Sequence, residues 1–191
     1  LGTGILENTA TVSSTNGDTN LENNSDTEDT TVIEEETVCR ENTTWASSVI
    51  AFDQGLRKNG TPVIPERSIP AATLGTPNAV TTTPNSGFYS LGKGGTITVK
   101  FTDPVLDVVG NDLSFHEVTN GRNSYPLESV SVEVSADDTT WFPAGNATSE
   151  QGGDGIVFVD FSSTGLSSVQ YVRITDTTNF ALNSDANSDG Y

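Results

Sequence analysis

The apolar positions in the second half of the chain alternate with polar ones, which is the period of a β-strand with one buried face. In residues 95–101, Ile97, Val99 and Phe101 fall on one face, and threonines and a lysine fall on the other. Helical periodicity is absent, and turns rich in Gly, Asn and Asp separate the apolar runs. Further strands are predicted at residues 112–118, 128–135, 155–161 and 168–175. The pattern therefore predicts an all-β, antiparallel sandwich, in which 155–161, apolar on both faces, is a central strand.

Residues 1–44 differ from the rest, and we treat them as a segment that precedes a domain formed by residues 45–191. They contain ten acidic residues and one basic residue, Arg40. Two short β-like runs, residues 5–13 and 27–35, flank a stretch rich in turn formers. Two interpretations remain open. The segment is either an acidic, partly disordered linker, or a β-hairpin that needs a partner because two isolated strands are marginal in water.

The charge of the chain excludes several partners. Its 191 residues include 26 acidic and 8 basic side chains, for a formal net charge of −18. Nucleic acids and anionic membrane surfaces both select basic patches, so neither is expected as a partner. No apolar run is long enough to span a membrane. The Thr, Ser, Asn and Gly content is typical of extracellular β-modules, and the lack of methionine suggests a mature or excised piece of a secreted or cell-surface protein.

The N-terminal segment resembles part of a known kind of module. Its sequence NTATVSSTNGDTNLENNSDTEDTTV is similar to the last hairpin of the Ig-like repeats found in tandem on bacterial surface and secreted proteins. Those repeats end with an Asn-Thr-Ala-x-Val strand, an Asn-Asn-Ser turn and a closing strand rich in Thr and Val. The resemblance spans residues 5–33 and not the rest of such a repeat. It therefore implies a hairpin that lacks its own sheet.

The larger segment carries a second resemblance. VSVEVSADDTTWFPAG, LSSVQYVRITD and FYSLGKGGTITVKFTDPV are similar to stretches of the galactose-binding-like, discoidin-type jelly rolls, and to a bacterial surface branch of them in particular. The resemblance covers residues 45–191. It implies a jelly-roll β-sandwich that serves as a binding or accessory module. It also implies a further strand after Tyr191, where the given sequence stops.

The sequence shows no constellation for nucleophilic catalysis. The one histidine, His116, and the one cysteine, Cys39, lie in different segments, and no Gly-x-Ser-x-Gly elbow is present. A single histidine also argues against a zinc site. With 26 acids in the chain, a pair of carboxylates has no specificity as a sign of a glycosidase. We therefore expect a protein that is not an enzyme.

Calcium is the metal that the side chains favour, because it binds hard oxygen ligands. Near the end of the chain, three side chains at alternate positions followed by Gly190 have the spacing of the first half of a calcium loop. The predicted ligands are Asp185, Asn187, Asp189 and the carbonyl of Tyr191. The acid that would complete such a loop lies beyond the sequence, so a polar tail is the alternative interpretation.

A second predicted calcium cluster lies in the middle of the chain. Its members are Asp107, Asn111, Asp112 and Glu117, with Asp154 as an additional ligand. Alternation points Glu117 inward beside Leu113 and Phe115. An inward carboxylate needs a cation or several donors, and the partner would be a metal, Arg122 or Arg173.

Two further functions remain open. Arg122, Asn123 and Tyr125 form a candidate loop for binding a glycan, whereas Trp141, at the start of a strand, is expected in the core. An unpaired hairpin and an open sheet edge could instead satisfy one another between molecules or between neighbouring domains of one surface protein. We therefore predict a structural or adhesive surface module that is stabilised by calcium, with a carbohydrate-binding module as the alternative.

Overall fold

The computed structural model describes residues 4–32, 44–78, 86–118, 127–148, 155–182 and 188–191, and it divides the chain into two compact units, Leu1–Thr43 and Thr44–Tyr191. Within these ranges, the helices are 3-10 helices of three or four residues, the other regular elements are β-strands, and all the strand pairs are antiparallel. The predicted all-β, antiparallel class is confirmed.

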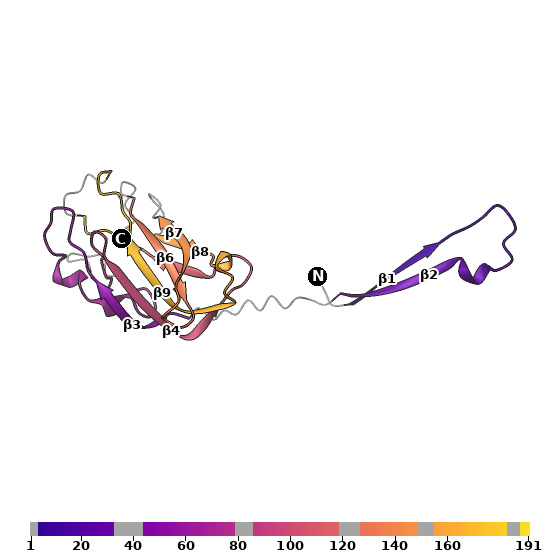
Figure 1. The fold of residues 1–191 in the computed structure, drawn as a ribbon, viewed down its shortest axis with the longest axis horizontal. Coiled ribbons are helices and arrows are strands. Elements are labelled where there is room, and N and C mark those ends of the chain that lie inside the picture. Colours follow the sequence, from indigo (N-terminus) through magenta and orange to yellow (C-terminus); the bar gives the residue numbers. More distant parts are fainter. Residues whose placement is uncertain (1–3, 33–43, 79–85, 119–126, 149–154, 183–187) are drawn as a thin grey trace. The chain divides into compact units, whose positions relative to one another are not determined.

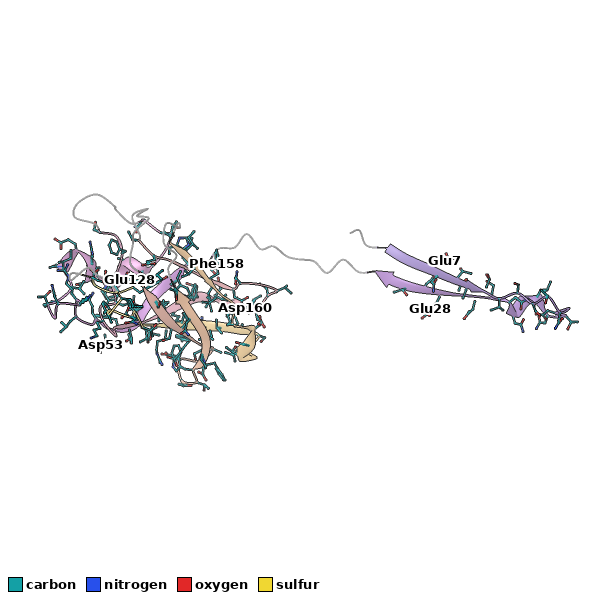
Figure 2. All side chains as sticks on the ribbon, turned by 90° about the horizontal axis from the view of Figure 1, so that it is seen from above. Glu7, Glu28, Asp53, Glu128, Phe158 and Asp160 are labelled. Carbon is teal, nitrogen blue, oxygen red and sulfur yellow. The ribbon has the colours of Figure 1, made fainter. Side chains whose placement is uncertain are left out.

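The first unit contains a β-hairpin (Figure 1). Strand β1 (Gly4–Thr11) pairs with β2 (Ser25–Val32) without a register shift, and a short 3-10 helix, η1 (Leu21–Asn23), lies in the connection. The hydroxyls of Thr9 and Thr27 are 2.9 Å apart across the strands. Side chains project from both faces of this ribbon, and those of Glu7 and Glu28 are labelled in Figure 2.

The second unit is built on a five-stranded sheet with the order β3-β4-β9-β6-β7. Its strands are β3 (Ala46–Asp53), β4 (Thr96–Leu106), β6 (Ser129–Ser135), β7 (Phe142–Thr148) and β9 (Ser168–Asp176). Alternation decides which side chains are buried, because Val130, Val132 and Val134 of β6 are almost fully enclosed, while Ser131 and Glu133 between them are only half-buried.

A smaller sheet of β5 (Leu113–His116) and β8 (Ile156–Val159) packs against the large one. Leu113, Val157 and Val159 join the valines of β6 and β9 in a single apolar cluster, so the two sheets form a sandwich. Segment 155–161 was expected in the centre of a sheet. Its strand, β8, lies instead in this two-stranded sheet, where Phe158 is 58% exposed. A run that is apolar on both faces does not determine how many strands pair with it.

The described residues of the second unit also include short 3-10 helices: η2 (Pro65–Arg67), η3 (Pro70–Thr73) and η4 (Ser162–Thr164). The η2 turn brings Arg67 next to residues 188–191, and η4 follows β8 directly. The predicted strands thus form one layered domain whose loops carry most of the chemistry-bearing side chains.

Candidate functional site

Three aspartates meet at one end of the small sheet, and we call them the aspartate cluster: Asp107, Asp112 and Asp160. Asp107 follows β4, Asp112 precedes β5 and Asp160 follows β8. Because Leu113 pairs with Val159 in antiparallel register, the residues just outside that pair are brought together. Ligand oxygens of the three aspartates all lie within 4.8 Å of one another.

Backbone amides hold the side chains of Asp112 and Asp160 in place. Asp112 accepts hydrogen bonds from the Val108 amide at Oδ1 and from the Phe161 amide at Oδ2, both at 3.0 Å. The hydroxyl and the amide of Ser162 lower the pKa of Asp160 from its ordinary value. The cluster therefore gathers side-chain carboxyl oxygens of the kind that calcium binds.

The structure brings together two of the four residues predicted for the central cluster. Asp107 and Asp112 are joined by Asp160, which the sequence did not indicate because the pairing of β5 with β8 is not visible in it. Asn111 is exposed beside Asp112 in the chain, and Asp154 lies outside the described residues. Three carboxylates are fewer than a calcium ion needs, so water and carbonyl oxygens would complete the shell.

Glu117 does not belong to the aspartate cluster. It follows the opposite end of β5 from Asp112, about 16 Å along the strand at about 3.3 Å per residue. Its amide donates to the carbonyl of Gly155 at 2.8 Å, and both of its carboxylate oxygens are buried, as alternation predicted. Burial, together with the charges of Glu117 and Glu128, raises the pKa of Tyr191 far above its ordinary value, which places these side chains in one interior region.

The last residues of the chain, Ser188–Tyr191, pack into the second unit, and we call them the C-terminal segment. The amides of Lys58, Gly92 and Leu91 donate to the carbonyls of Ser188, Asp189 and Tyr191 at 2.7–2.8 Å. These bonds tie the segment to two separate loops.

Side chains of the C-terminal segment are also engaged. Arg67 Nη1 lies 2.8 Å from Asp189 Oδ2, and both side chains are largely buried. The Ser188 hydroxyl donates to Glu128 Oε1 at 2.8 Å, and Glu128 is 2% exposed. Figure 2 labels Glu128.

These contacts assign structural roles to the two described members of the predicted calcium half-loop. Asp189 neutralises Arg67, and the Tyr191 carbonyl, predicted as a ligand, accepts a hydrogen bond from Leu91. Asp185 and Asn187 lie outside the described residues, so a metal in that loop stays a prediction.

The candidate glycan loop, Arg122, Asn123 and Tyr125, lies outside the described residues, and glycan binding stays a prediction. Trp141 was expected in the core, and this expectation is wrong. The guanidinium of Arg173 stacks over its ring at 3.8 Å and contacts Glu133 at 3.3 Å, on the face of the large sheet opposite the buried valines. The aromatic face of Trp141 is thereby covered by a cation.

His116 is exposed, and its ring packs edge-on against Trp45 with centroids 5.6 Å apart.

Comparisons with protein-family models, with curated proteins and with solved structures found no match. Within the described ranges, no helix combines the length and apolar character that crossing a membrane requires.

Calcium is expected to raise the melting temperature of the protein through the aspartate cluster, because a ligand that binds only the folded state stabilises it by mass action. At about 100 times the dissociation constant, the gain is about 2.7 kcal/mol. Calorimetry with calcium and with EDTA measures it. Asp160→Asn should remove most of the calcium-dependent shift, while Asp103→Asn, at an exposed position of β4, should keep it. Equal melting temperatures in calcium and EDTA contradict the prediction.

Proposed function

We propose that the protein is a non-enzymatic structural module of an extracellular bacterial surface protein or surface fibre, and that its N-terminal hairpin joins it to other copies by strand complementation. The observation that carries the proposal is the hairpin itself. It is an ordered two-stranded ribbon that pairs only β1 with β2. Calcium at the aspartate cluster would stabilise the module.

The exposure of the hairpin supports this function. Ile5 is 70% exposed, Val12 68% and Leu21 72%, so the apolar side chains of this unit that the structure describes have no core of their own. Two strands alone are marginally stable in water, and a third strand or a packing partner is the usual remedy. A strand of another molecule supplies backbone hydrogen bonds and covers these side chains.

The charge of the chain sets a condition for assembly. At a net charge of −18, copies of the protein repel one another over a distance that salt reduces to about 8 Å at physiological ionic strength. Divalent cations or salt should therefore promote association. This behaviour suits a protein that works in a salty or calcium-rich exterior.

Deleting residues 1–36 is expected to convert an assembling protein into a monomer. Sedimentation velocity and light scattering of the purified chain, in reductant and with Cys39 replaced by Ser, measure the change. Thr9→Pro, which removes an amide from the middle of β1, should mimic the deletion. Thr15→Pro, in the connecting loop, is the matched control and should assemble normally. Assembly that survives the deletion would overturn the proposed function.

A further inference from the structure

We infer that the acceptor for the hairpin is the free edge of β3 in a second copy of the chain, and that β1 is the strand that pairs with it. The inference rests on the proposed function, since it names the partner surface of the same hairpin. The large sheet ends in β3 on one side and in β7 on the other, so the described sheet offers two edges.

The β7 edge is poorly suited to accept a strand. Pro143 has no amide hydrogen to donate to a further strand. The strand also contacts β8 and η4. Proline and a neighbouring segment are usual features that protect an edge from pairing.

In the part of the chain that the structure describes, no further strand pairs with the β3 edge, and the edge is apolar. Its sequence ASSVIAFD has no proline, and its last four residues are exposed, with Ile50 at 42% and Phe52 at 57%. The η3 turn reaches only its start, where the Gly75 amide donates to the carbonyl of Ala46. An exposed apolar edge of this kind is a template for another strand.

The two bulges of β3 bear on the shape of the donor. Ser47 and Ile50 fall outside the pairing register with β4, which increases the local twist. A flat strand would fit such an edge poorly, but a two-stranded ribbon twists more strongly than a strand in a large sheet. The hairpin is a ribbon of this type, and β1 and β3 are both eight residues long.

Charge selects β1 over β2 as the donor strand. Three acids lie on β2, namely Asp26, Glu28 and Asp29, whereas β1 carries Glu7 and the exposed Ile5. The acceptor β3 carries one acid, Asp53, and Ser48 on it lies opposite Lys100 of β4. Pairing through β1 therefore brings fewer like charges together and leaves the acidic strand facing solvent.

We assign the occupant to a second copy because the described part of the chain supplies both halves of such a pairing, a two-stranded ribbon in the first unit and a sheet that ends in β3 in the second. Each copy then offers one donor ribbon and one acceptor edge on different units. Such head-to-tail pairing builds a ring if the rotation between successive copies closes, and an open fibre if it does not.

Two charge substitutions test this assignment in the full-length chain, again with Cys39 replaced by Ser. Ile50→Glu places an acid at the β3 edge, and Asn146→Glu places the same charge at an exposed position of β7. We expect Ile50→Glu to weaken association about tenfold, through lost apolar contact and repulsion of the acidic hairpin. Asn146→Glu should stay within about twofold of the parent. Sedimentation equilibrium measures both constants.

A mixing experiment separates a blocked edge from a misfolded domain. The Ile50→Glu chain keeps its hairpin, and the chain without residues 1–36 keeps its β3 edge. At a concentration where the parent assembles and the weakened Ile50→Glu chain does not, neither variant should polymerise alone, but together they should form a one-to-one complex. If the hairpin deletion abolishes assembly while Ile50→Glu associates within about twofold of the parent, the acceptor lies elsewhere, and only this inference is overturned. If the parent chain is a monomer, or if the deletion has no effect, the proposed function fails as well.

Discussion

Replacing Asp176 with alanine is expected to lower the free energy of unfolding of the second unit by about 3–5 kcal/mol. Asp176 ends β9 and is 5% exposed. Its Oδ2 accepts from the Gly94 amide at 3.0 Å, and its Oδ1 accepts from the Thr178 hydroxyl at 2.6 Å and from the Tyr191 amide at 3.2 Å. The substitution leaves the Gly94 and Tyr191 amides without this acceptor, and the Thr178 hydroxyl keeps only its longer contact with the Ser129 carbonyl at 3.4 Å. Each buried donor left unpaired costs about 1–3 kcal/mol.

Guanidinium unfolding followed by tryptophan fluorescence measures this loss. Both tryptophans, Trp45 and Trp141, belong to the second unit, so the signal is independent of the hairpin. Asp176→Asn keeps one acceptor oxygen and should give an intermediate loss, and the exposed Asp103→Ala should change stability by less than about 0.5 kcal/mol. A loss below about 1 kcal/mol for Asp176→Ala would contradict the prediction that the hydrogen bonds to this carboxylate stabilise the second unit.

The C-terminal segment also shows where the sequence was ambiguous. The alternation of Asp185, Asn187 and Asp189 before Gly190 suggested a calcium loop. Gly190 has a φ of +74°, and a Cβ there would lie 2.9 Å from Asp176 Oδ1. A glycine is thus required by the packing of the segment whether or not a metal binds, and the spacing alone could not separate the two reasons.

Local pattern predicted the strands well, because burial of one face leaves a period of two in the sequence. It did not predict how strands pair over long distances in the chain. Asp160 was missed for this reason, since only the register of β5 with β8 brings it beside Asp112. The position of Trp141 was wrongly predicted because its stacking with Arg173 depends on a residue 32 positions away in the sequence, which the local pattern does not show.

Phe161 connects the aspartate cluster to the core, and Phe161→Ala is expected to lower the free energy of unfolding by about 3–5 kcal/mol. The side chain is 0% exposed, and its amide donates to Asp112 Oδ2. Removing the ring leaves a cavity between the sheets that the surrounding valines fill only in part. Phe158→Ala is the matched control, because Phe158 is three positions away and 58% exposed.

The comparison of the two phenylalanines tests the packing of the two sheets against each other as well as the role of Phe161. Phe158→Ala should cost less than about 1 kcal/mol in the same unfolding experiment. Similar losses for both variants would contradict the assignment of one residue to the core and the other to the surface. Because the Phe161 ring anchors the loop that carries Asp160, loss of the ring should also reduce the calcium-dependent gain in melting temperature, whereas loss of Phe158 should not. The stability of the module and its affinity for calcium are therefore expected to depend on the same buried side chain.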